Sequence, residues 1–223
     1  MNYDIQVNNV SKTYDSVSIL DNVNLMIEKG TTVGIVGGNG SGKSVLFKVI
    51  CGFTAPDTGT VDIRDKRLGR DIDFPEDVGV FINSPGYISL YNGLQNLKFL
   101  ADINGKIGIN KIKETMKIVG LNPDNKAKVK DYSLGMKQKL GIAQAIMEDQ
   151  DIVVLDEPFN ALDYKTYNDI KEIIKHLQEQ DHTMVLTSHN YQDIEELCDI
   201  VYLIDEGRLK PLTDKLKEEY FSR

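Results

Sequence analysis

The sequence predicts an α/β fold with a mostly parallel sheet, a small antiparallel β subdomain and an inserted helical subdomain. Within residues 152–204, short apolar runs alternate with helical patterns, which is typical of buried parallel strands and their crossover helices. Apolar and polar residues alternate instead within 3–27 and 61–63, which predicts antiparallel strands with one solvated face. Apolar residues recur at helical spacing between 84 and 147, so this stretch is expected to be helical.

A glycine-rich loop at 37–44 joins a predicted buried strand, 31–36, to a predicted apolar helix, 45–50, and fits the pattern G-x-x-x-x-G-K-[ST]. Its glycines let the backbone turn sharply, so that N–H groups of the loop and helix can bind phosphate oxygens. Lys43 would reach the β- and γ-phosphates of a nucleoside triphosphate, and the Ser44 hydroxyl would bind Mg²⁺. The expected phosphate-binding residues are Gly37, Gly38, Asn39, Gly40, Ser41, Gly42, Lys43 and Ser44. The loop therefore predicts a P-loop NTPase core.

Composition restricts the class of protein. The chain has 223 residues, 41% of them hydrophobic and 27% charged, as expected for one domain with a subdomain. It has no apolar run near the roughly twenty residues of a membrane span, and its N-terminus does not resemble a signal peptide. The net charge of −8 argues against a dedicated nucleic-acid surface. Cys51 and Cys198 lie in apolar segments, which favours core packing in a reducing cytosol over a disulfide.

Two acidic residues, Asp156 and Glu157, directly follow the predicted buried strand 152–155. A carboxylate at the end of such a strand can hold Mg²⁺, and Glu157 could then activate water for attack on the γ-phosphate. The alternative is a pair of acids at the entry to a turn that Pro158 begins.

Two further residues are candidates because of their positions. His189 follows the predicted strand 183–187 and could donate a hydrogen bond to the γ-phosphate, although a lone histidine is more often structural. Tyr14 lies in the predicted connection between the first two strands, 23 residues before Gly37. Its ring could stack on a purine base, and the alternative is a surface tyrosine on a hairpin.

Taken in order, these segments resemble the nucleotide-binding subunit of an ATP-binding-cassette (ABC) transporter from Tyr3 to about Lys210. The resemblance identifies 37–44 with the Walker A motif and 152–156 with the Walker B motif. It places Tyr14 at the aromatic residue that stacks on adenine in this family.

The same resemblance assigns further roles. It makes Glu157 the catalytic glutamate, His189 the switch histidine and 160–163 the D-loop. The segment 132–136 occupies the position of the family's signature motif, which commonly reads Leu-Ser-Gly-Gly-Gln and is kept here only at the serine and the second glycine.

The departures from the common motifs are similar to those of ATPase subunits of drug and peptide-antibiotic exporters. In the signature, Ser133, Gly135 and Met136 are expected to face a γ-phosphate, although Met136 cannot supply the amide contacts of the usual glutamine. Such relatives usually carry Gln or Glu at the position of Asn83. Asn83 keeps an amide oxygen for Mg²⁺ or water but is one methylene shorter.

The resemblance implies that two such subunits form a head-to-tail dimer that hydrolyses ATP with Mg²⁺. The loop 37–44 of one subunit would face 133–136 of the other, which could be the same chain or a related one. Closure would drive a separate integral membrane permease that docks near Asn83–Leu100, so the chain would lie in the cytoplasm on the inner face of the cell membrane. The exported substrates would be antimicrobial peptides or lipophilic drugs.

One nucleotide-binding domain is expected over 1–223. The α/β core with its β subdomain would occupy about 1–83 and 148–210, the helical subdomain about 84–147, and a short tail 211–223. An ABC ATPase of a soluble assembly that acts on Fe–S clusters, ribosomes or DNA is the alternative. A small-molecule P-loop kinase is disfavoured by the signature segment and the histidine together.

Overall fold

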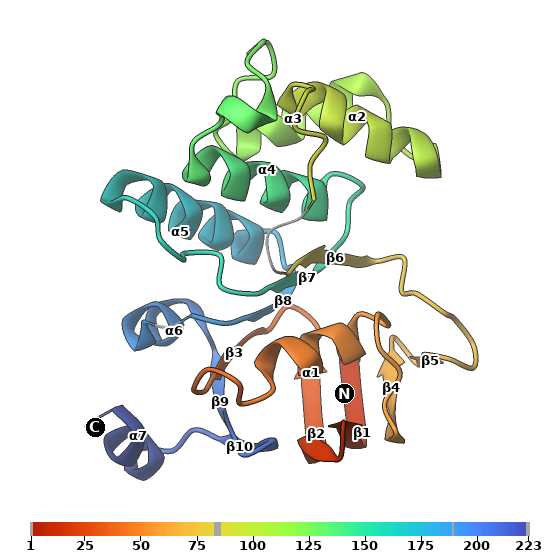
Figure 1. Cartoon of the computed structure of the whole chain (residues 1–223), viewed down its shortest axis with the longest axis vertical. Helices are drawn as coiled ribbons and strands as arrows, with labels where there is room; N and C mark the ends of the chain where they lie inside the picture. The colour runs from red at the N-terminus through yellow and green to blue at the C-terminus, as the bar shows by residue number, and fades with distance from the viewer. Residues whose placement is uncertain (1, 83–85, 189, 222–223) are drawn as a thin grey trace. The chain divides into compact units, whose positions relative to one another are not determined.

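The computed structural model describes residues 2–82, 86–188 and 190–221. Contacts divide the chain into two compact units, Met1–Pro75 with Thr183–Arg223, and Glu76–His182 (Figure 1). Each unit has strands and helices of its own around buried apolar side chains.

The first unit contains an antiparallel sheet of four strands in the order β2-β1-β4-β5. Its strands are β1 (Tyr3–Tyr14), β2 (Val17–Glu28), β4 (Thr58–Ile63) and β5 (Lys66–Arg67). Alternate side chains of β1 and β2 are buried, as the period-two pattern predicted, and they include Ile5, Val7, Val23, Leu25 and Ile27.

The hairpin between β1 and β2 is longer than the sequence pattern indicated. Asp15 and Ser16 form its turn with φ angles of 46° and 65°, which suit a two-residue hairpin connection. The segment 11–14 was expected to connect the strands, and that expectation was wrong, because these residues pair with β2 as the end of β1. Tyr14 therefore lies on a strand, next to the turn.

The first unit also contains strands in the order β10-β9-β3-β8. The strand β3 (Thr32–Val36) is parallel to β8 (Thr183–Leu186) on one side and to β9 (Ile200–Asp205) on the other. The strand β10 (Arg208–Pro211) is antiparallel to β9. All of β3 is buried, which explains its nearly continuous apolar sequence.

Three helices belong to this unit, namely α1 (Lys43–Ile50), α6 (Tyr191–Leu197) and α7 (Asp214–Phe221). The expected tail at 211–223 thus contains a helix. Its sequence is largely charged, so its apolar periodicity was too weak to be recognised.

A buried carboxylate joins the two sheets of the first unit. Asp4 on β1 is only 2% exposed and accepts hydrogen bonds from Thr183 Oγ1 of β8 at 2.5 Å and from Arg64 Nε at 2.9 Å. The same Thr183 oxygen accepts a hydrogen bond from the backbone N–H of Gly30 at 2.8 Å. The hydroxyl therefore satisfies one buried donor and one buried acceptor.

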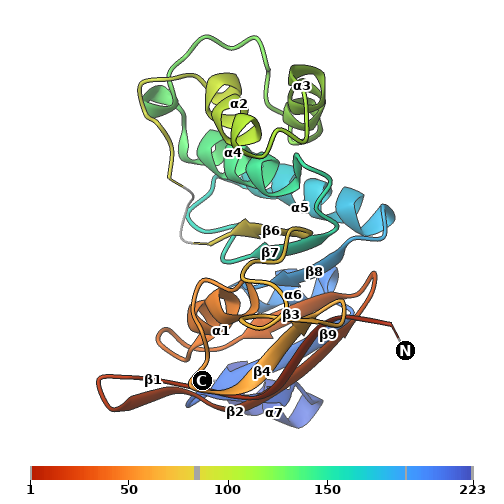
Figure 2. The same cartoon turned by 90° about the vertical axis from the view of Figure 1, so that its right-hand side faces the viewer.

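In its described residues, the second unit combines a pair of parallel strands with α-helices (Figure 2). The strands are β6 (Val78–Phe81) and β7 (Ile152–Leu155); the helices are α2 (Gly93–Asn104), α3 (Ile109–Ile118), α4 (Leu134–Ile146) and α5 (Tyr164–Glu179). The central helix α4 contacts β6, α2, α3 and α5. It approaches β6 so closely that a Cβ on Gly79 would lie 1.8 Å from the carbonyl oxygen of Ala145, which only glycine allows.

Both cysteines are free thiols. Cys51 is buried, and burial raises the pKa of its thiol to about 12. A thiol with so high a pKa is unreactive at neutral pH, as predicted for a cysteine that packs in the core. Among the residues that the structure describes, none of the helices has both the length and the hydropathy to cross a bilayer.

We predict that Thr183→Val destabilises the protein. Valine has nearly the shape of threonine but cannot hydrogen-bond to Asp4 or to the N–H of Gly30, so the free energy of unfolding should fall by about 1–3 kcal/mol. Chemical denaturation followed by circular dichroism measures the loss. Thr183→Ser keeps the hydroxyl and is the matched control. Equal stability of Thr183→Val and the natural protein would show that these bonds contribute nothing.

Candidate active site

The lysine of the glycine-rich loop lies on the loop's own backbone. Lys43 is the first residue of α1 and is buried, and its ammonium donates hydrogen bonds to the carbonyl oxygens of Gly37 at 2.7 Å and Gly38 at 3.0 Å. No side chain caps α1, and its first turn has no acidic residue. The positive end of this helix and a fixed ammonium therefore lie at one short loop, which suits an anion.

Two glycines allow close packing around this loop. A Cβ on Gly37 would lie 2.4 Å from the carbonyl oxygen of Ile204 on β9. Gly42 has a φ of 108°, and a Cβ there would lie 2.7 Å from the carbonyl oxygen of Ile19 on β2. A side chain at either position would displace a strand, so the loop's conformation requires glycine at both.

The contact at Ile19 brings the β1–β2 hairpin against the phosphate loop. Tyr14 lies near the tip of this hairpin, with 44% of its surface exposed. The Lys12 ammonium lies 5.3 Å from the centroid of the Tyr14 ring, within the range of a cation–π interaction. A partly exposed aromatic ring on the hairpin that contacts the loop is consistent with stacking on a nucleotide base.

In the second unit, Asp156 follows the last residue of β7, as the sequence indicated. Its backbone N–H donates a 2.7 Å hydrogen bond to the carbonyl oxygen of Phe81 at the end of β6, and the residue is 6% exposed. Glu157 has a φ of 53°, an uncommon value for a residue with a side chain. Such a conformation is found most often at turns and functional sites.

The signature segment forms the start of α4. Ser133 is its N-cap, and the Ser133 hydroxyl accepts a hydrogen bond from the N–H of Met136 at 3.2 Å. Ser133 and Leu134 are exposed, whereas Gly135 is buried. A Cβ on Gly135 would lie 2.3 Å from Cγ2 of Thr166 on α5, so glycine is required where the two helices meet.

The D-loop segment ends in the cap of α5. Asp163 accepts hydrogen bonds from the backbone N–H of Thr166 at 3.0 Å and from its hydroxyl at 2.8 Å. Both bonds, the backbone one foremost, lower the pKa of Asp163. Ala161 has a φ of 56°. Thr166 therefore contacts both the signature glycine and the residue that ends the D-loop.

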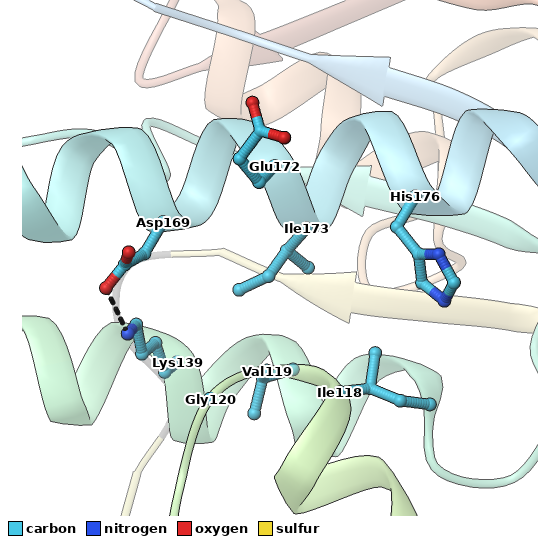
Figure 3. Close-up of a pocket in the computed structure, with 8 residues that line it drawn as sticks. All are labelled: Ile118, Val119, Gly120, Lys139, Asp169, Glu172, Ile173 and His176. Carbon is cyan, nitrogen blue, oxygen red and sulfur yellow. Dashed lines mark hydrogen bonds and ion pairs between the residues drawn. The ribbon is translucent and has the colours of Figure 1, made fainter.

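Farther along the same two helices, an ion pair joins α4 to α5 beside a cavity of about 290 Å³ (Figure 3). Lys139 Nζ lies 2.7 Å from Asp169 Oδ2. Glu172, Ile173 and His176 of α5 line the cavity on one side, and Ile118, Val119 and Gly120 line it on another. The helices α4 and α5 are thus connected at two places, by the contact of Gly135 with Thr166 and by the Lys139–Asp169 ion pair.

Two predicted site residues, His189 and Asn83, lie outside the described residues, as do Ser84 and Pro85. The residues before and after His189 in the chain, Ser188 and Asn190, form hydrogen bonds. The Ser188 hydroxyl donates a 3.0 Å hydrogen bond to buried Asp193 and accepts one from the N–H of Asn190, which caps α6.

Comparison with known proteins identifies the family. A family model described as "ABC transporter" matches residues 20–160, more than half of the chain. The chain belongs to the ABC transporter family. It is an ATP-binding domain of the type that binds and hydrolyses ATP, so the alternative of a small-molecule P-loop kinase is set aside.

Curated ABC proteins of bacteria are similar over nearly the whole chain. An uncharacterized ABC transporter ATP-binding protein, YybJ of Bacillus subtilis, is 40% identical over 92% of this chain and 94% of its own. The bacitracin transport ATP-binding protein BcrA of Enterococcus faecalis is 33% identical over 94% of this chain and 68% of its own. The lantibiotic transport ATP-binding protein SrtF of Streptococcus pyogenes is 31% identical over 92% and 88%.

Solved ABC cassettes have the same fold. A dimeric, post-hydrolysis structure of the ATP-binding cassette MJ0796 with ADP and Pi has a TM-score of 0.82 and 25% identity, over 94% of this chain and 99% of that one. A nucleotide-free cassette of an ABC transporter has a TM-score of 0.85 over 99% and 96% of the two chains. At 20% identity, the second comparison concerns the fold alone. The predicted fold class and family are confirmed.

Sequence patterns did not reveal which residues surround the motifs. Ile19 and Ile204, which contact the Walker A loop, and Thr166, which contacts the signature, are ordinary residues without a motif of their own. Only the requirement for glycine at 37, 42 and 135 indicates that something lies close to the backbone there.

We predict that Gly135→Ala destabilises the second unit. The added methyl group would overlap Thr166 Cγ2, and overpacking of this kind costs about 1–3 kcal/mol. Thr166→Ser removes Cγ2 but keeps the hydroxyl bonded to Asp163, so it should restore part of the lost stability. Denaturation of the two single variants and the double variant measures the coupling. Strict additivity of the two effects would contradict the contact.

Proposed function

We propose that this chain is the Mg²⁺-dependent ATPase subunit of a bacterial-type exporter and that it drives a separate membrane-spanning subunit. The observation that carries the proposal is the Walker A loop, where a buried lysine and the start of α1 lie at one tightly packed turn. Backbone N–H groups from Gly37 to Ser44 bind the phosphates, and Lys43 contacts the β- and γ-phosphates.

The oxygen donors of the motifs suit magnesium. The hydroxyl of Ser44 at the start of α1 and the buried carboxylate of Asp156 at the end of β7 are hard ligands of the kind that Mg²⁺ prefers. The amide oxygen of Asn83 is proposed as a further ligand, directly or through water. When bound, the ion neutralises charge on the phosphates. The chain's own residues hold the nucleotide and position water.

Hydrolysis requires a group that accepts a proton from the attacking water. Glu157 is proposed for this role because it directly follows the buried Asp156 at the end of β7. His189 is proposed to donate a hydrogen bond to the γ-phosphate and to respond to its loss. Ser188 and Asn190, the residues before and after it in the chain, are hydrogen-bonded to each other.

A complete site is proposed to need two chains. Ser133, Gly135 and Met136 of one subunit close over the nucleotide bound to the Walker A loop of the other, which is the same chain or a related one. The exposed N-terminus of α4 supports this, because Ser133 and Leu134 are accessible there. The dimeric MJ0796 cassette supports it as well.

The membrane subunit is proposed to dock near residues 83–100. Large apolar side chains are exposed there, namely Ile88, Leu90, Tyr91 and Phe99. Tyr91 and Phe99 meet edge to face with ring centroids 5.0 Å apart, so they form one apolar surface. Such a surface suits a protein partner. Through this partner the chain would lie on the inner, cytoplasmic face of the cell membrane.

The proposed cargo is an antimicrobial peptide or a lipophilic drug. The names of the similar bacitracin and lantibiotic transport proteins support the peptide, whereas the drug rests on the resemblance of the motifs alone. The proposed division of labour assigns about 1–83 and 148–210 to the catalytic core and about 84–147 to the helical subdomain that contacts the permease. The helices α2, α3 and α4 fall within that range.

We predict that Glu157→Gln binds ATP normally but hydrolyses it at least about 100-fold more slowly, because the amide cannot accept the proton of water. Phosphate release and ATP binding are measured on the same preparation. Glu172→Gln is the matched control, since it removes an exposed carboxylate of α5 in the same unit. Hydrolysis at an unchanged rate in Glu157→Gln would exclude Glu157 as the catalytic base.

We predict that Tyr14→Ala weakens ATP binding by about 1–3 kcal/mol, the value of one base–aromatic stack. Tyr14→Phe keeps the ring and should bind ATP nearly as well as the natural chain. Equilibrium dialysis with labelled ATP measures both affinities. If Tyr14→Ala bound ATP with unchanged affinity, Tyr14 would be a surface residue of the hairpin and nothing more.

A further inference from the structure

The tip of the β1–β2 hairpin extends beyond the third strand of its sheet. The last residue of β1 that pairs with β4 is Ser11, opposite Thr58. From there to the turn, β1 pairs only with β2. An isolated two-stranded ribbon is marginally stable in water, so Tyr14 at its end needs support from elsewhere to keep a fixed position.

Asp57 supplies this support, immediately before β4. One of its carboxylate oxygens accepts a 2.7 Å hydrogen bond from the Lys12 ammonium, and the other accepts a 2.7 Å hydrogen bond from the N–H of Thr13. Its own N–H donates to the carbonyl oxygen of Ser11 at 2.9 Å. One residue thus holds three consecutive residues of β1 directly before the tyrosine.

The ammonium that Asp57 binds is the one that lies over the tyrosine ring. Lys12 Nζ is 2.7 Å from Asp57 Oδ1 and 5.3 Å from the centroid of Tyr14. The Lys12 side chain is only 15% exposed, so it is confined rather than free in solvent. The ring itself is 44% exposed, so a base could still reach it beside the ammonium.

Asp57 lies in the chain between the Walker A helix and β4, and it contacts the hairpin that carries Tyr14. It ends the short connection that follows α1, the helix that begins at Lys43 of the Walker A loop. On its other strand, the same hairpin contacts Gly42 through Ile19. The hairpin is therefore fixed at both edges by segments that adjoin the phosphate loop.

We propose that Asp57 is a positioning residue for nucleotide binding, which holds Lys12 and Thr13 so that the Tyr14 ring is presented to the base of the nucleotide. The inference rests on the stacking role proposed for Tyr14. Asp57 does not touch the nucleotide itself. A single ion pair whose carboxylate is 44% exposed adds little to overall stability, so the effect of removing Asp57 should be found in base recognition.

The absence of tryptophan from the chain provides a direct test. Tyr14→Trp introduces a single indole, whose emission should fall when ATP stacks on it. Asp57→Ala is combined with this change, and ATP is titrated with Mg²⁺. Inorganic tripolyphosphate, which has no base, is titrated as a competitor of ATP. Asp71→Ala is the matched control, because Asp71 also accepts bonds from an arginine and a backbone N–H in the same unit.

Asp57→Ala is expected to weaken ATP binding by about threefold to tenfold and to reduce the quench at saturation. This loss of affinity should be smaller than the loss that Tyr14→Ala causes by removing the ring. The dissociation constant of tripolyphosphate, derived from the competition, should be unchanged, and thermal melting should match that of Asp71→Ala. Asp57→Asn keeps an acceptor for the N–H of Thr13 and should give a smaller loss.

Two results would overturn the inference. The first is an unchanged affinity and quench in Asp57→Ala, and the second is an equal loss of affinity for ATP and for tripolyphosphate, which would place the effect on the phosphate loop. If the stacking role proposed for Tyr14 were itself wrong, Tyr14→Ala would bind ATP normally whatever residue stands at position 57. That result can be told apart from a failure of the role proposed for Asp57.

Discussion

The close packing of backbone around the Walker A loop is the constraint on which the rest of the first unit depends. At Gly37 and Gly42 the loop approaches the carbonyl oxygens of Ile204 and Ile19, with no space for a side chain at either glycine. These contacts place the loop between β9 and the β1–β2 hairpin, so the parallel strands and the antiparallel sheet meet at this loop. If the loop binds phosphates as proposed, such close packing would reduce the ordering that binding requires.

The second unit obeys a similar constraint at one residue. Gly135 lets the start of α4 approach Thr166, and Thr166 in turn satisfies the carboxylate of Asp163 at the start of α5. Lys139 and Asp169 join the same helices farther along. Thr166 and the Lys139–Asp169 pair thus connect α4 to α5 at two places.

The sequence predicted what local patterns determine. The spacing of the Walker A residues predicted a helix that starts at the end of the loop, and the apolar run before Asp156 predicted a buried strand. It did not predict β6, a four-residue strand interrupted by Gly79, since four residues are too few to establish a period. The contacts of Asp57 and Thr166 were not predictable either. The bonds of Asp57 to Lys12 and Thr13 and the contact of Thr166 with Gly135 join residues far apart in the chain, of types that are common on any surface.

These contacts explain which residues of the family's usual signature are kept in this chain. The position after Ser133 commonly carries glycine, but here Leu134 is 45% exposed, so a large side chain fits without displacing any neighbour. The next position keeps its glycine, because a Cβ there would overlap Thr166. Ser133 is retained as well, and its hydroxyl caps α4. At the start of α4, Gly135 is thus required by close packing and Ser133 serves as the cap, whereas the side chain of Leu134 is exposed.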